Sequence, residues 1–189
     1  MKNVCVFLLL VLFSCGKKES VSLPQSDITS IKDVQDYSPI YLFFKTNGKD
    51  TLVEVNRKNT ISSTNWIFHI DKRLPLRLVI PEIIKLQAKK EGSAHKSETS
   101  ENYFSYSDSI RKNLAFLPFT KVNYQLTSPK GGEVVFISKN GFSLEKLKKT
   151  KANTSLKFDK NLSFEKYLQY KIAIQNLHLS NVSKEEFVY

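Results

Sequence analysis

Two aspartates are the side chains whose type and spacing best fit a chemical role. Asp71 and Asp159 lie 88 positions apart, and each is followed by a lysine, Lys72 or Lys160. Two carboxylates that meet in space could act as general acid and base, and the Asp-Lys pairs could contact a partner. The alternative is structural, because an aspartate at a strand-to-helix turn accepts backbone N–H groups. We favour this interpretation, since it explains the acid, its position and its repetition together.

Other reactive groups are sparse in the sequence. The three histidines, His69, His95 and His178, show no metal-ligand spacing with one another or with acids. There is no Gly-x-Ser-x-Gly motif, phosphate-binding loop or dinucleotide-binding glycine pattern. We therefore predict a protein that binds rather than catalyses, with no cofactor and no metal. A catalytic site assembled from distant residues stays open as the alternative.

Strand and helix patterns position the first aspartate. Residues 65–71 place Trp66, Phe68 and Ile70 on one side, which predicts a strand ending at Asp71. From Leu76 onward, apolar residues recur with the period of a helix. Upstream, residues 47–48 (Asn-Gly) separate two β-rich runs and predict a hairpin.

This strand–turn–helix pattern occurs twice. Residues 68–86 align with residues 156–174 without a gap, and the apolar positions of the two helices coincide at nearly every turn. The sequence therefore predicts an α+β fold of two repeats, each a small mixed or antiparallel sheet packed by one main amphipathic helix. We assign residues 37–128 to the first repeat and residues 129–189 to the second. Whether they share one core or form two is left open.

A polar insert over residues 87–113 separates the two copies and is typical of a long solvated loop. It contains Tyr103, Phe104 and Tyr106. Exposed aromatics on a loop are candidates for contacts with sugars or partner surfaces. Such aromatics more often fold back on the core, and we favour that interpretation.

The first fifteen residues are typical of an export signal. Lys2 precedes an uncharged apolar run over residues 4–13, which is shorter than the roughly 20 residues that span a bilayer. The sequence Leu-Phe-Ser-Cys at residues 12–15 resembles the lipobox of bacterial lipoproteins. The resemblance implies a signal peptide over residues 1–14, a lipid thioether on Cys15 and a flexible tether over residues 15–36. With Gly16 in place of an aspartate, it also implies the outer membrane, facing the periplasm.

The repeated unit resembles the periplasmic domain of the ExbD/TolR proteins. The matching pieces are IDKRLPLRLVI (70–80) and FDKNLSFEKYL (158–168), and residues 182–187 are similar too. The resemblance implies contacts with envelope proteins, with peptidoglycan or with a second copy. Members of that family have a spanning helix with an acidic residue, which residues 4–14 lack. The proton-driven role of the family is therefore not expected here.

Charge and export together narrow the partners. Lysine and arginine number 29 against 18 acidic residues, a formal net charge of +11. Export excludes nucleic acid and leaves anionic envelope polymers, lipid headgroups or a merely solvated surface as explanations of the charge. We predict a lipid-anchored cell-envelope binding module, accessory to an ExbD/TolR-type transport or tethering complex and without proton coupling. Its expected partners are the membrane and an envelope protein or peptidoglycan, with a homodimer left open. The alternative is an envelope hydrolase acting on glycan or peptide.

Overall fold

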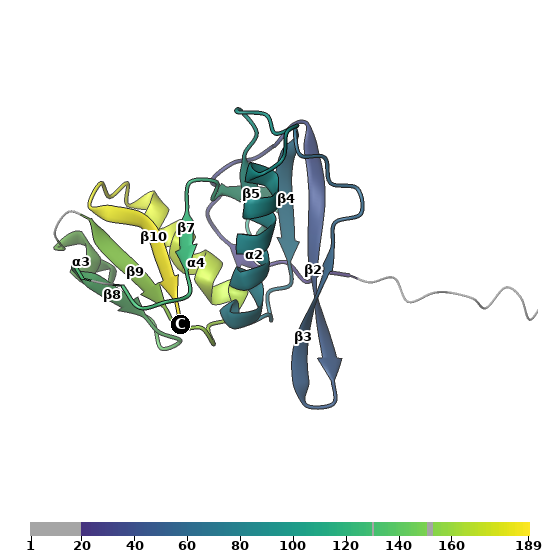
Figure 1. Ribbon diagram of the computed structural model, residues 1–189. Helices are drawn as coiled ribbons and strands as arrows, with labels where there is room; N and C mark the ends of the chain where they lie inside the picture. Colours follow the sequence, from purple (N-terminus) through teal and green to yellow (C-terminus); the bar gives the residue numbers. More distant parts are fainter. Residues whose placement is uncertain (1–19, 130, 151–152) are drawn as a thin grey trace, which may run out of the picture.

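The computed structural model describes residues 20–129, 131–150 and 153–189 (Figure 1). It has an α+β fold with two sheets and, within those residues, three helices. The elements in chain order are β1 (Gln25–Ser26), β2 (Tyr37–Asn47), β3 (Asp50–Asn56), β4 (Asn65–Ile70), α2 (Leu76–Glu91), β5 (Asn102–Asp108), β6 (Leu114–Pro118), β7 (Asn123–Gln125), β8 (Val134–Ile137), α3 (Leu144–Lys148), β9 (Thr154–Phe158), α4 (Phe164–Asn176) and β10 (Val182–Val188).

The larger sheet has the strand order β1-β5-β4-β2-β3. Strands β4 and β1 pair with successive parts of one edge of β5, and β6 pairs with its other edge. Strands β1, β5, β4 and β2 run parallel, and β3 is added antiparallel to β2. The β2–β3 hairpin confirms the turn predicted at residues 47–48, because Gly48 adopts the left-handed φ of +60°. The tip of this hairpin projects from the body of the molecule in Figure 1.

The smaller sheet repeats the parallel part of the larger one. Its order is β7-β10-β9-β8, and all neighbouring strands are parallel. Strands β10, β9 and β8 thus correspond in order and direction to β5, β4 and β2. Helix α2 connects β4 to β5, and helix α4 connects β9 to β10. The smaller sheet is parallel throughout, whereas we predicted mixed or antiparallel sheets, because each helix crosses over between parallel neighbours.

The turn before α2 and the turn before α4 lie against each other and exchange equivalent hydrogen bonds. The backbone N–H of Leu76 donates to the carbonyl of Leu162 at 2.9 Å, and that of Phe164 donates to the carbonyl of Leu74 at 2.8 Å. Residues 74 and 76 are the counterparts of residues 162 and 164 in the 88-residue alignment. A bridge between Pro75 and Ser163 lies at the centre of this exchange. The aligned segments are therefore also equivalent in space.

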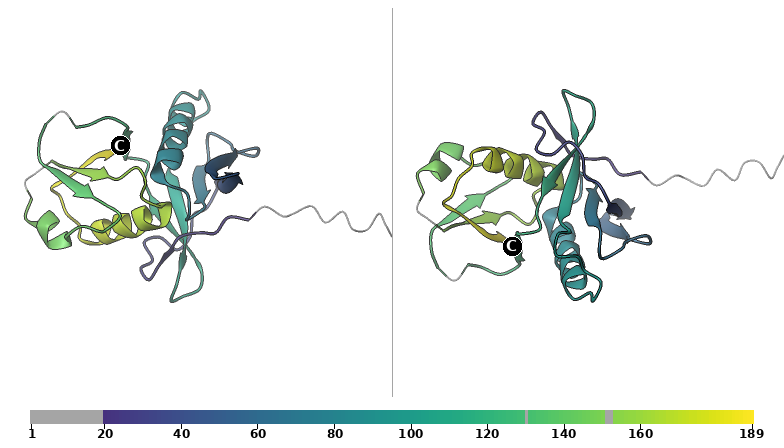
Figure 2. Two further views of the ribbon diagram at one scale, coloured as in Figure 1. Left: turned by 90° about the horizontal axis from the view of Figure 1, so that it is seen from below. Right: turned by 90° about the horizontal axis from the view of Figure 1, so that it is seen from above.

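One hydrophobic cluster joins the two halves, which decides between one core and two. Figure 2 shows α2 on the face of the larger sheet that is turned towards the smaller sheet. The buried apolar residues of the two long helices all belong to this cluster, namely Leu76, Val79, Ile80, Ile83 and Leu86 of α2 and Phe164, Tyr167, Leu168, Ile172 and Ile174 of α4. The core is therefore fused.

Three segment boundaries differ from the prediction. Strand β7, which the predicted boundary places with the first repeat, pairs in the smaller sheet. The insert 87–113 is not one loop, because it contains the end of α2 and the whole of β5, a strand paired on both sides. Residues 20–36 are not a flexible tether, because β1 pairs with β5 and Val34 is buried.

Candidate functional site

The two Asp-Lys turns position backbone rather than form a reactive pair. Asp71 follows β4, is fully buried, and accepts hydrogen bonds from the backbone N–H groups of Ser22 and Arg73. Both Nε and a terminal nitrogen of Arg73 donate to the same carboxylate at 2.8 Å. The carboxylate of Asp159 accepts the backbone N–H of Asn161, at 2.9 Å. These contacts are those of turn-capping aspartates.

The pKa of Asp71 also favours a turn-capping role for this residue. Burial acts to raise its pKa, but the hydrogen bonds from Arg73 and Ser22 outweigh burial and lower the pKa. A carboxylate held ionised and fully buried cannot exchange protons with a substrate or contact a partner. Of the two lysines, Lys72 forms an ion pair with Glu165 at 3.6 Å, and Lys160 is exposed. Asp71 is therefore part of the scaffold.

The three aromatics of the predicted insert lie on β5. Phe104 and Tyr106 are fully buried, so neither is a partner contact. Their rings face the helices because alternate residues of a strand point to the same face. Tyr103 points to the opposite face, is partly exposed, and donates its hydroxyl to Glu101 at 3.0 Å. The interpretation that these aromatics fold back on the core is confirmed for Phe104 and Tyr106.

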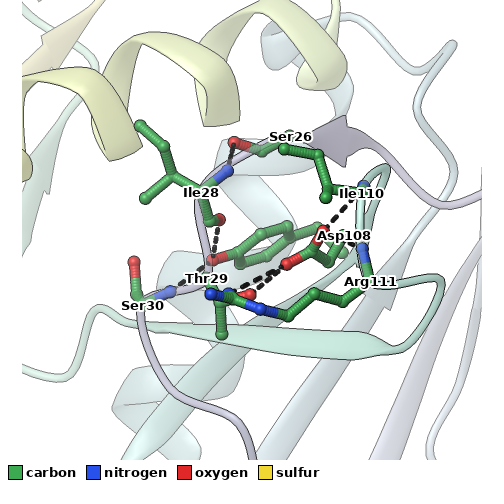
Figure 3. Close-up of polar contacts among 8 residues, drawn as sticks. Ser26, Ile28, Thr29, Ser30, Asp108, Ile110 and Arg111 are labelled. Carbon is green, nitrogen blue, oxygen red and sulfur yellow. Dashed lines mark hydrogen bonds and ion pairs between the residues drawn. The ribbon is translucent and has the colours of Figure 1, made fainter.

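Residues 20–36, which we call the N-terminal strap, are fastened to the end of β5 by Asp108 (Figure 3). The buried carboxylate of Asp108 accepts the hydroxyl of Thr29 and the backbone N–H groups of Ile110 and Arg111, the last two at 2.8 and 2.7 Å. The hydroxyl of Tyr106 adds two contacts, donating to a strap carbonyl and accepting a strap N–H. Polar strap residues are thus held by partners distant in sequence.

Because the hydrogen bonds to Asp108 require its ionised carboxylate, we expect the protein to lose their contribution to stability in acid. The hydrogen bonds from Thr29, Arg111 and Ile110 lower the pKa of Asp108 to about 2. An unfolded aspartate has a pKa of about 3.9, so this contribution is complete above about pH 4 and is lost as the pH falls through 2. In urea titrations, we expect the stability difference between wild type and Asp108→Asn to shrink from pH 6 to pH 2. Asp27→Asn, on the exposed part of the strap, is the control. A constant Asp108→Asn difference across this range contradicts the prediction.

A serine and a histidine meet on the outer face of the larger sheet. The hydroxyl of Ser105 lies 2.8 Å from Nδ1 of His69, which stacks on Tyr41 at a ring distance of 4.8 Å. Burial lowers the pKa of His69 to about 4, so its ring is neutral at pH 7. Ser105 is fully buried, and a nucleophile that a substrate cannot reach does no hydrolysis. The pair is structural.

A second buried polar cluster lies between α4 and the smaller sheet. Glu186 is buried and accepts hydrogen bonds from Tyr167, at 2.8 Å, and from Lys171. The hydroxyl of Tyr124 lies 2.9 Å from that of Tyr167. Burial, with the charge of Glu186 second, raises the pKa of both tyrosines well above the ordinary value. Both hydroxyls therefore remain protonated, and the cluster is a satisfied network within the core.

The cavities of the described residues are open and modestly polar. One of about 440 Å³ lies between the strap and α4, beside Gln25, Ser26 and Gln169. Another of about 350 Å³ adjoins Lys171 and His178. Residues 20–129, 131–150 and 153–189 contain no group of His, Cys, Asp or Glu suited to a metal ion. Nor does any helix in these ranges have the length and apolarity to span a membrane.

The outer edge of β8 is the most distinctive uncovered feature. In the larger sheet the equivalent strand β2 pairs with β3 only from Tyr41 onward, which covers the counterparts of Phe136 and Ile137. No described strand pairs with the far side of β8. The backbone of Glu133 and Ile137 faces β9, because their carbonyls accept the N–H groups of Ser155 and Asp159. By alternation, the backbone groups of Val134 and Phe136 point away from the sheet. We call this the β8 edge.

Exposed apolar side chains lie on β8, and a lysine of the neighbouring strand β9 lies over one of them. Val134 and Phe136 are 36% and 49% exposed. The ammonium of Lys157 lies 5.1 Å from the ring centre of Phe136 and 3.8 Å from that of Tyr189. In the larger sheet the corresponding pair is His69 stacked on Tyr41, with Tyr41 backbone-paired to β3. A sequence-based search for reactive residues missed this edge, since its signal is a missing strand.

Comparison with known proteins adds no assignment. No family model, curated protein or solved structure showed a significant match to the chain. The predicted lipidation residue, Cys15, lies outside the described residues, as do the signal peptide and the first residues of the predicted tether. The geometry of the β8 edge therefore carries the functional argument.

Proposed function

We propose that the protein is a lipid-anchored binding module of the cell envelope, and that it holds a protein partner at the β8 edge. In this proposal Cys15 carries the lipid, and residues 1–14 are removed. The fold contributes a rigid scaffold of two ExbD/TolR-like repeats, accessory to an envelope transport or tethering complex. The module itself has no proton-coupled and no catalytic step.

The uncovered β8 edge is the observation that carries this proposal. A strand at the edge of a sheet presents a row of N–H and C=O groups that can pair with an extended segment of another chain. In the larger sheet, β3 pairs with Tyr41 and Leu42, the counterparts of Phe136 and Ile137. A strand edge that no described strand covers, as at β8, is consistent with use by a partner.

The buried polar groups favour binding over hydrolysis. Asp71, Asp108 and Glu186 are all buried and hydrogen-bonded within the fold. Among the described residues, every buried side-chain nitrogen or oxygen has a hydrogen-bond partner. An enzyme site usually holds polar groups that converge on a pocket and await a substrate. These carboxylates instead stabilise the scaffold.

Photo-crosslinking in living cells tests the proposal. A photoreactive phenylalanine replaces Phe136 at the β8 edge in one strain and Tyr37 in the control strain. These two side chains are matched, since they are 49% and 53% exposed. We expect a defined protein adduct from position 136 and none from position 37, identified by mass spectrometry. The adduct should disappear in Cys15→Ser, which lacks the anchor.

Other results of this experiment would support or contradict the proposed function. Recovery of subunits of a proton-driven envelope motor from position 136 would support the accessory role. Equal crosslinking from positions 136 and 37, or none from either, contradicts a partner at the β8 edge. A Cys15→Ser protein that stays in the membrane fraction contradicts lipid anchoring.

A further inference from the structure

We infer that the turn between β5 and β6 rests on the surface of an anionic lipid bilayer, with Ile110 in the interface and Lys112 beside the headgroups. The inference rests on the proposed function, because the lipid on Cys15 is what brings the folded body to the bilayer. It adds which side of the body faces the membrane. Its basis is the chemistry that the turn exposes and the place of the turn relative to the start of the strap.

The β5–β6 turn exposes apolar and basic side chains together. Residues 110–114 are all exposed and have the sequence Ile-Arg-Lys-Asn-Leu. Ile110 is 70% exposed, the largest fraction among the large apolar side chains of the described residues, and Leu114 is 44% exposed. No aspartate or glutamate occurs from Ser109 to Gly132. Such a segment suits the interface of an anionic bilayer, where apolar groups leave water and cations meet lipid phosphates.

Asp108 fixes the backbone of this turn (Figure 3). Its carboxylate accepts the N–H groups of Ile110 and Arg111. Its carbonyl accepts the N–H of Lys112 at 3.0 Å, and its own N–H donates to the carbonyl of Asn113 at 2.9 Å. A turn whose backbone is already ordered has little backbone entropy left to lose when it meets a surface, and this favours binding.

The turn lies at the edge of the larger sheet from which the chain leads back to Cys15. Strands β4 and β5 are parallel, so the turns that follow them lie at the same edge. Ser22 is fastened at this edge, because its N–H donates to the carboxylate of Asp71 directly after β4. The N–H of Ser109 donates to the carbonyl of Ser26 in β1 at 2.8 Å. A lipid on Cys15, seven residues before Ser22, therefore holds this edge towards the bilayer.

The loop between β3 and β4 has similar chemistry at the opposite edge. It contains Ile61, which is 59% exposed, and the exposed residues Arg57 and Lys58. The N–H of Ile61 donates to the hydroxyl of Ser38 near the start of β2. The six residues of β4, which rise about 20 Å, separate this loop from the edge at Ser22. We expect the loop to stay in water, since it differs from the β5–β6 turn mainly in position.

The contact needs little affinity of its own. Arg111 forms an ion pair with Asp108 at 3.4 Å, and the neighbouring part of the strap has one exposed acid, Asp27. Ile110 and Lys112 thus provide most of the attraction, which is too weak to recruit a free protein. For an anchored protein the second contact is intramolecular, so the effective concentration of the bilayer is high and a weak contact is populated.

Tryptophan quenching tests the inference on the lipidated protein, reconstituted into vesicles of phosphatidylcholine and phosphatidylglycerol with brominated acyl chains. Ile110→Trp and Ile61→Trp report on the two loops, and the buried Trp66 adds the same background to both. We expect quenching to be about twofold stronger for the tryptophan at position 110 than for the one at position 61. Quenching at position 110 should weaken with added sodium chloride and in vesicles without phosphatidylglycerol.

Two lysine variants test the charge in the Ile110→Trp protein. Lys112→Asn removes the cation of the turn and should weaken the quenching. Lys112 has a left-handed φ of +58°, which asparagine also adopts, so the turn is expected to keep its conformation. Lys58→Asn, in the loop at the opposite edge, is the control and should leave the quenching unchanged. Equal melting temperatures of the two variants verify that both are folded.

Each outcome decides the inference. Equal quenching at positions 110 and 61 overturns it, and so does quenching at position 110 that neither Lys112→Asn nor the loss of phosphatidylglycerol weakens. If quenching is equal while position 136 still crosslinks a protein in cells, the membrane-facing side is wrong and the proposed function stands. If mass spectrometry finds no lipid on the purified protein, the proposed anchoring is wrong and the inference fails with it.

Discussion

Replacing Glu186 with alanine is expected to lower the free energy of unfolding by about 3–5 kcal/mol. Glu186 is buried and accepts hydrogen bonds from Lys171 and Tyr167. Its removal leaves an ammonium that is largely buried and a hydroxyl without that acceptor. The cost of stranding a buried charge exceeds the benefit of an ordinary hydrogen bond. Chemical denaturation at pH 7 measures the effect.

The neighbouring glutamate is the matched control. Glu185 lies on the same strand but is exposed, so Glu185→Ala should change stability by no more than about 0.5 kcal/mol. The double variant Glu186→Ala, Lys171→Met removes the unpaired charge and should recover part of the loss. A Glu186→Ala protein as stable as Glu185→Ala would show that the buried network contributes nothing.

The second large effect is expected for Phe104→Ala, which should cost about 3–5 kcal/mol. Phe104 is fully buried and stacks on Phe119 at a centroid distance of 3.8 Å. Its ring also meets Phe164 and Tyr167 of α4 edge-on, at 5.2 and 6.3 Å. The ring therefore links β5 of one half to α4 of the other, and alanine leaves a cavity where the two halves meet.

Cooperativity provides a second readout for Phe104→Ala. Because the core is shared, we expect both halves to unfold in one transition, in the wild type and in the variant. Phe136→Ala is the control, since that ring is half exposed and should cost less than about 1 kcal/mol. Two separated transitions in the wild type would contradict a fused core.

The sequence predicts those elements whose signal is local. The Asn-Gly turn after β2, the alternation in β4 and the helical period from Leu76 each depend on neighbouring residues, and all three are confirmed. The alignment of residues 68–86 with 156–174 matches segments that are equivalent in space. It succeeds because both helices must bury the same face against one core.

The missed elements depend on distant partners. Strand β5 has the sequence NYFSYSD, whose serines and flanking polar residues resemble a loop, although Phe104 and Tyr106 alternate as a strand requires. The strap contains only scattered apolar residues, and its hydrogen bond from Thr29 to Asp108 joins residues 79 positions apart. The β8 edge is recognised only by comparison with β3. Local patterns contain none of this information.

The fastening of the strap limits how far the molecule can reach. Ser22 is already tied to Asp71 and Lys72, and β1 to β5. Between Cys15 and Ser22 there are seven residue steps, which extend to at most about 25 Å. A free chain over residues 15–36 would extend roughly three times as far. With a lipid on Cys15, the folded body is confined to the vicinity of its bilayer. If the proposed lipid anchor and partner are present, the partner has to approach the membrane in order to bind.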